Sequence, residues 1–205
     1  MNSQETSVLD IAQISPIVSV HARGRRHPNR SQQGLSLIEV SVVSAIVLLL
    51  AIIGIPAING FVIENRVPKV GEGIARFVVN HTVNTPIFEE KPYSKVNNQF
   101  FINQLDEAGV FNVDSQGSST RILHGLGKNG LVDLVADQSG AQLKITFTNV
   151  HHAACPGLAS VLQRVATSIK VENVAVKDAT VTYNAIHTRQ QCKKGDVNTF
   201  EFTVI

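Results

Sequence analysis

The stretch QQGLSLIEVSVVSAIVLLLAIIGIPAI, from Gln32 to Ile58, is the most apolar part of this 205-residue chain. Gly34 precedes the apolar run, and a single carboxylate, Glu39, stands near its start. From Val40 to Ile63 the chain has 24 residues without a charge. A helix of that length extends about 36 Å, more than the roughly 30 Å of a bilayer's hydrocarbon core. The run predicts a membrane-spanning helix, because a chain of this size could not surround a core helix that is apolar on every face.

The segment before the apolar run is basic. Residues 1–34 carry four arginines against Glu5 and Asp10, so their formal charge is +2, and the remaining 14 basic and 14 acidic residues cancel. Positive charge before a span favours retention of that segment in the cytoplasm and export of the chain beyond the span. An ordinary cleavable signal peptide has a shorter apolar core and a small-residue cut site after it. The neutral remainder argues against nucleic acid as a direct ligand, because such binding depends on phosphate contacts.

This order of features resembles the signature of type IV prepilins, in which a basic leader ends in glycine and a glutamate stands five residues later. With Gly34 as the last leader residue, Leu35 is the first mature residue and Glu39 the fifth. The resemblance implies a dedicated membrane peptidase that cuts after Gly34 and methylates the new amine of Leu35. The long leader, and leucine rather than phenylalanine after the cut, resemble the type IVb subclass. That subclass includes toxin-coregulated, bundle-forming and plasmid thin-pilus subunits.

The resemblance also implies roles for Glu39 and Pro56 in assembly. Glu39 is the only charged side chain from Leu35 to Ile63. It falls in the first helical turn, where the helix dipole partly compensates its charge. In a filament it would pair with the Leu35 amine of a neighbouring subunit; the alternative is an interfacial residue that only marks the helix start. Pro56 would loosen the helix during assembly, and a simple kink is the alternative.

Beyond the bilayer the sequence predicts an α+β plan. A helical stripe of apolar residues, Val70, Ile74, Phe77 and Val78, would extend the long helix until Pro86 and Pro92. Residues 97–109, with Gly109 as the C-terminal cap, and a segment that begins near Pro156 predict two shorter helices. Four segments predict strands, the first two of them joined as a hairpin across ADQSG: LVDLV (131–135), LKITFTNV (143–150), VTYNA (181–185) and TFEFTVI (199–205).

The pilin resemblance implies a ladle-like α+β fold, in which the long N-terminal helix packs across an antiparallel sheet. It divides the chain into three parts: a cytoplasmic leader (1–34) that is removed, a membrane and filament-core helix (35–63), and an exported head (64–205).

Cys155 and Cys192 both lie in the exported part, where disulfides form. A bridge that closes a loop of this size stabilises by about 4 kcal/mol on the chain-entropy model. In pilins such a bridge bounds the D-region, a surface for contacts between subunits and with partners. A reactive Cys155 at a helix start is the alternative, and the spacing matches no CxxC metal site.

Two further motifs could suggest chemistry. GLGKNG, with Gly125, Gly127 and Gly130, has the spacing of a dinucleotide fingerprint, but a strand-like segment comes after it, so a glycine-rich turn is favoured. His151 and His152 are adjacent, and in a strand they would point to opposite faces, which disfavours a metal site. The sequence shows no catalytic constellation, and we expect no enzymatic activity, no cofactor and no bound metal.

The sequence therefore predicts a structural subunit of a type IVb pilus, held first in the bacterial inner membrane and then in an extracellular fibre. Its expected partners are copies of itself, the prepilin peptidase, the assembly machinery and a possible host or bacterial surface receptor. A minor pilin or a type II secretion pseudopilin would carry the same signature. A membrane-anchored binding protein or enzyme would need neither Gly34 nor Glu39, and its sequence should show a site.

Overall fold

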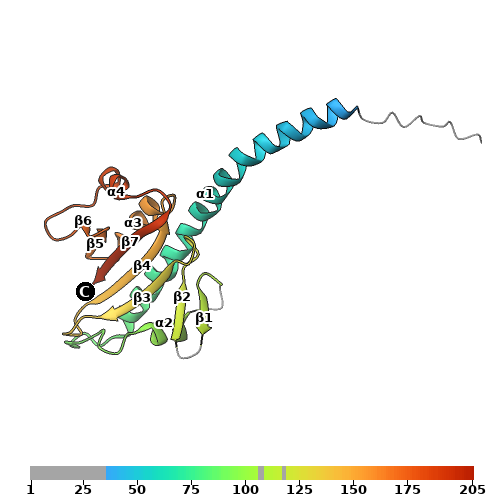
Figure 1. Ribbon diagram of the computed structural model, residues 1–205. Helices are drawn as coiled ribbons and strands as arrows, with labels where there is room; N and C mark the ends of the chain where they lie inside the picture. The colour runs from blue at the N-terminus through green and yellow to red at the C-terminus, as the bar shows by residue number, and fades with distance from the viewer. Residues whose placement is uncertain (1–35, 106–108, 117–118) are drawn as a thin grey trace, which may run out of the picture. The chain divides into compact units, whose positions relative to one another are not determined.

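The computed structural model describes residues 36–105, 109–116 and 119–205 (Figure 1). The expected leader, the cleavage site at Gly34 and the methylated Leu35 lie outside the described residues. The chain divides into two units, residues 1–43 and 44–205. The head belongs entirely to the second unit.

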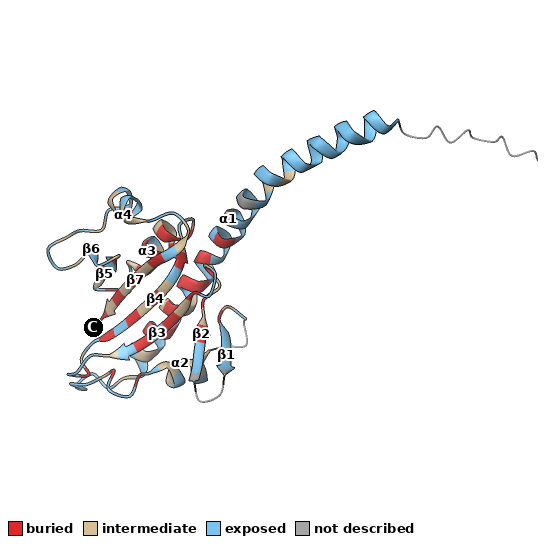
Figure 2. Ribbon diagram, in the orientation of Figure 1, coloured by how far each residue is buried: buried red, intermediate tan, exposed pale blue. Residues whose placement is uncertain are grey.

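Helix α1 is the longest element and covers Leu37–Asn84. The expected helical stripe is confirmed, because Val70, Ile74, Phe77 and Val78 are all buried. Figure 2 shows that the buried residues of α1 lie only in its C-terminal half. The helix ends just before Pro86, which has no backbone N–H to continue the ladder. The expected end of the long helix is therefore confirmed.

The described residues contain one seven-stranded antiparallel sheet in the order β1-β2-β3-β4-β7-β5-β6. The strands are β1 (Asn112–Gln116), β2 (Ser119–Leu123), β3 (Leu131–Ala136), β4 (Leu143–His151), β5 (Ser168–Val171), β6 (Val174–Lys177) and β7 (Asp196–Val204). The shorter helices are α2 (Asn98–Gln104), α3 (Cys155–Leu162) and α4 (Ala185–Gln191). The expected α+β fold, a long helix with an antiparallel sheet, is confirmed.

The expected hairpin between β3 and β4 is present, with Leu134 opposite Ile145. Its turn closes through Gly140, whose φ of 75° suits glycine. Alternation along β4 buries Leu143, Ile145 and Phe147 on one face. The final predicted strand is confirmed as part of β7, which buries its alternate residues in the same way.

Two local expectations are wrong. Residues 181–184 form no strand, and α4 begins at Ala185. The reason is Asn184, whose side-chain oxygen accepts hydrogen bonds from the amides of Ile186 and His187 at 2.9 and 3.0 Å and so caps a helix instead. Helix α2 ends at Gln104, so Gly109 is not its C-terminal cap.

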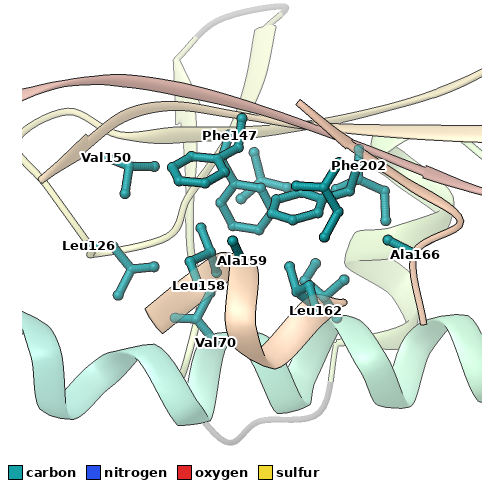
Figure 3. Close-up of a cluster of buried hydrophobic side chains, with 14 of the residues drawn as sticks. Val70, Leu126, Phe147, Val150, Leu158, Ala159, Leu162, Ala166 and Phe202 are labelled. Atoms are coloured by element: carbon teal, nitrogen blue, oxygen red, sulfur yellow. The ribbon is translucent and has the colours of Figure 1, made fainter. Parts of the chain in front are cut away.

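Helix α3 lies between α1 and the sheet (Figure 3). Its Leu158 and Leu162 are buried in the core. Two glycines bring α3 and α1 together: a Cβ on Gly71 would lie 2.4 Å from Val161 Cγ1, and a Cβ on Gly157 would lie 3.2 Å from Val67 Cγ1. The core of the head thus has three layers, with α3 in the middle.

Candidate functional site

The N-terminal half of α1 presents its apolar side chains to the outside. Exposure reaches 86% at Leu37 and 64% at both Leu50 and Ile58. Among the described residues α1 alone is long and apolar enough to cross a membrane, with a mean hydropathy of 2.7 in its most apolar window. None of that window is buried inside the protein. A continuous apolar surface of this kind requires lipid or protein to cover it.

Glu39 lies in the first turn of α1. Its Oε2 accepts a hydrogen bond from the backbone amide of Ser36 at 3.3 Å. The first amides of a helix have no partner within the helix, so the carboxylate satisfies one of them and complements the helix dipole. In the isolated chain Glu39 therefore stabilises the start of its own helix. Its expected partner, the Leu35 amine, lies outside the described residues.

Pro56 falls within α1, which continues as α-helix on both sides of it. A proline there has no N–H to offer the carbonyl of Ile52, four residues earlier, so one hydrogen bond of the ladder is missing. The helix is locally weakened at the position where the pilin resemblance implies a loosened segment.

A disulfide joins Cys155 to Cys192, with their Cα atoms 6.0 Å apart. It connects the start of α3 to the C-terminal cap of α4 and encloses α3, β5, β6 and α4. Since Cys155 is fully buried and bonded, it offers no thiolate, which removes the alternative of a reactive cysteine.

The region between the cysteines is also held by charged side chains. Lys177 Nζ donates to the carbonyls of Gln163 and Ala166, at 2.5 and 2.6 Å, at the C-terminal end of α3, where a cation suits the helix dipole. Glu172, in the β5–β6 turn, accepts from Lys193 Nζ at 2.5 Å and from the amide of Thr199 at 2.6 Å. The contacts of Lys177 hold β6 to the end of α3 within the enclosed region, and those of Glu172 hold the β5–β6 turn to Lys193 and β7.

The GLGKNG segment is a turn between β2 and β3 that packs against β4. A Cβ on Gly127 would lie 2.0 Å from the carbonyl oxygen of Asn149, and a Cβ on Gly130 would lie 2.2 Å from the ring of His124. The glycines are therefore needed for close packing within the head, which favours the turn over a phosphate-binding loop.

His124 is the buried group beneath this turn. Its Nδ1 accepts a hydrogen bond from the amide of Leu126 at 2.9 Å, and its Nε2 lies 2.9 Å from the carbonyl of Thr148. This pattern fits a neutral ring that carries its proton on Nε2. Burial lowers the pKa of His124, although the hydrogen bond to Thr148 acts in the opposite direction.

His151 and His152 do not point to opposite faces, because β4 ends at His151. Their rings lie close together, with centroids 4.2 Å apart and ring planes inclined at 37°. Each Nδ1 accepts a backbone amide hydrogen, from Ala153 at 3.1 Å and from Gly195 at 3.4 Å. The proton of each neutral ring then sits on Nε2, which leaves no free lone pair for a metal. Burial, and then the charge of His152, lower the pKa of His151, and Asp196 opposes them.

Residues 128–205 match the family model described as PilS N terminal. The match runs from the glycine-rich turn to the end of β7 and contains both cysteines. Among solved structures, the crystal structure of a type IV b pilin from Salmonella typhi is similar, with 16% sequence identity and a TM-score of 0.48. The similarity covers 66% of this chain and 95% of that chain. No curated protein matches significantly.

Proposed function

Taking the chain as a type IVb pilin, which the PilS family match and the α+β fold support, we propose that it is the structural subunit of a surface pilus. The observation that carries this proposal is a long helix whose exposed N-terminal half is apolar, attached to a head closed by a disulfide. The fibre would serve adhesion, aggregation, motility or DNA transfer.

In this proposal the three parts of the chain act in sequence. The leader, residues 1–34, stays in the cytoplasm until the prepilin peptidase cuts after Gly34 and methylates Leu35. The helix of residues 35–63 holds the subunit in the inner membrane and later packs in the filament core. The head, residues 64–205, forms the outside of the fibre. Assembly replaces lipid around α1 with the apolar side chains of other subunits, so the helix stays covered throughout.

Burial of apolar side chains does not by itself fix the axial register of subunits, but a charge pair does. An unpaired carboxylate in a low-dielectric core is costly, so Glu39 requires a cation when the filament forms. The positive charge closest to Glu39 in the sequence is the amine of Leu35. The same amine on a neighbouring subunit is therefore the candidate partner. Glu39 would exchange its contact with the Ser36 amide, present in the single chain, for this stronger partner.

The test uses two substitutions at Glu39. Glu39→Gln keeps an oxygen for the Ser36 amide and removes the charge, whereas Glu39→Ala removes both. We expect both variants to be inserted and processed normally but to form few or no filaments, counted by electron microscopy. Glu64→Gln, which removes a charge just outside the uncharged run, is the matched control and should assemble normally.

Normal filaments from the glutamine variant would show that the contact within the chain is sufficient and that no charge pair forms. Bulky substitutions at Gly34 test processing, and the uncut precursor should then accumulate in the inner membrane. For the natural chain, mass spectrometry should find an N-terminal methylated Leu35. The amount of the protein in sheared filaments separates a major subunit from a minor pilin or a pseudopilin.

A further inference from the structure

The loop after α1 carries two large apolar side chains on its outer turn. Ile87 is 94% exposed and Phe88 is 95% exposed, more than any other large apolar side chain in the described residues. Both lie in a turn that closes through a hydrogen bond of 3.0 Å from the amide of Glu89 to the carbonyl of Pro86. We call residues 86–91 the tip. Exposed aromatic and aliphatic side chains side by side are typical of an interaction surface.

The tip is exposed although the loop that carries it is firmly held. At the base of the loop, His81 Nε2 lies 2.8 Å from the carbonyl of Pro92. The amide of Tyr93 donates to the carbonyl of Gly140 at 2.9 Å, and the Tyr93 side chain is buried. These contacts hold the loop with its tip turned away from the core of the head. A partner outside the chain is therefore needed to cover the tip.

A hollow of about 380 Å³ lies on the side of the head, between α1, α2 and the start of β1. Its floor is aromatic. Phe101 makes edge-to-face contacts with Phe77 and Phe111, with ring centroids 4.8 and 5.4 Å apart. The hollow is within the size range of pockets that hold small ligands, roughly 300 to 1,000 Å³, so it has room for one aromatic side chain.

The polar side of the hollow is cationic. Lys69, Glu72 and Arg76 line it and are all exposed, with a combined formal charge of +1. Arg76 Nη2 pairs with Glu72 at 2.7 Å, so within this trio the charge of Lys69 is the one that is not offset. The tip, PIFEEK, has two glutamates and one lysine and so a formal charge of −1. The tip and the hollow thus match in charge as well as in apolar character.

We propose that the tip of one subunit inserts into this hollow on a second copy of the chain. The Phe88 ring packs against the aromatic floor, where edge-to-face contacts are favourable. Glu89 accepts a hydrogen bond from the amide of Lys91 within the tip, so we assign the pairing with Lys69 to Glu90.

The tip and the hollow are different surfaces, so every copy can use both at once. A heterologous contact of this kind builds a ring or an open filament rather than a closed pair. The tip follows the end of α1 and the hollow lies along its side, so copies with parallel helices meet displaced along the helix axis. This inference rests on the proposed pilus and adds a specific contact between its heads.

The test places the photoreactive residue benzoylphenylalanine at position 88 of the full chain. Filaments and, separately, the chain purified in detergent are irradiated and digested. Mass spectrometry should find position 88 joined to a peptide that contains Phe77, Phe101 or Phe111. Mixing isotope-labelled and unlabelled chains in detergent should show that the joined peptides come from two copies. The same probe at Ile186, 73% exposed on α4, is the control and should not reach these peptides.

No crosslink in either sample, or crosslinks from position 88 only to other regions or to a different protein, would overturn the proposal. The detergent sample separates this failure from failure of the proposed function. A crosslink to the hollow there, without any filaments from the natural chain, would contradict the pilus and support the contact.

Substitutions test the two parts of the contact. Phe88→Ala should reduce the number of filaments at least about tenfold, as expected for an aromatic side chain at the centre of an interface. Glu90→Lys should reduce both filaments and the crosslink, and a second substitution, Lys69→Glu, should restore them. Lys170→Glu, at an exposed position on β5, is the matched control and should restore neither. Unchanged filaments from Phe88→Ala, or equal restoration by the two lysine substitutions, would overturn the proposal.

Discussion

A single methyl group at Gly71 should destabilise the head, because this glycine sets the distance between α1 and α3. The added Cβ would lie 2.4 Å from Val161 Cγ1 and 2.9 Å from Val161 Cβ, well inside ordinary carbon contact distances. Val161 is β-branched and has little rotamer freedom to move away. Overpacking of this kind destabilises a protein by about 1 to 3 kcal/mol. The higher helix propensity of alanine offsets about 1 kcal/mol of that loss. We expect Gly71→Ala to lower the free energy of unfolding by about 1 kcal/mol.

The size of this effect should fall when the γ-carbons of residue 161 are removed. In a Val161→Ala background the 2.4 Å contact with Cγ1 is gone and only the 2.9 Å contact with Cβ remains, so Gly71→Ala should destabilise the head less than it does in the natural chain. The assay is urea unfolding of the full chain in detergent, monitored by circular dichroism. Gly54→Ala is the control, since nothing lies within 4 Å of its added Cβ. If Gly71→Ala has the same effect with Val161 and with alanine at that position, the two helices do not meet as described.

Three further predictions concern the head. Loss of the disulfide by replacement of both cysteines with alanine should reduce the free energy of unfolding by about 4 kcal/mol, as a loop of this length implies; adding reductant should affect the natural chain but not the variant. Burial lowers the folded-state pKa of His124 below 6.5, so the unfolded chain takes up the proton first. Stability should therefore fall as the pH drops below 6.5 and go on falling to the folded-state pKa, and His124→Gln should flatten this dependence in urea titrations. Leu158→Ala, between α1 and the sheet, should cost about 2 to 5 kcal/mol, whereas Leu37→Ala, 86% exposed, should leave the melting of the head unchanged.

The parts of the fold that could be predicted are those whose own pattern specifies them. The stripe from Val70 to Val78 has a clear helical period, and β4 alternates apolar and polar residues through Phe147. Strands β1, β2, β5 and β6 have four to five residues each, too few for a pattern of their own to identify them. These strands form because longer strands pair with them. For example, β5 pairs with β7 and lies opposite Phe200 and Phe202. VTYNA has a strand pattern, but the Asn184 cap outweighs it.

The candidate site divides in the same way. The place of Glu39 in the first helical turn and the pairing of the two cysteines could be predicted from the sequence, because the apolar run is visible there and the chain has only two cysteines. Gly34 stays a prediction. The contacts of Glu172 could not, since its partners Lys193 and Thr199 lie far along the chain. They reach Glu172 only because β7 pairs with β5.

The place of β7 in the sheet affects how the head can fold. It is the last strand in chain order, yet it lies between β4 and β5 and joins them. While the chain is being made, β1–β4 and β5–β6 are two separate groups, each with an open edge where β7 will pair. Such edges pair readily with other chains. The head therefore stays open to wrong pairing until β7 has been made, and truncation before Asp196 should produce aggregates rather than a smaller folded head.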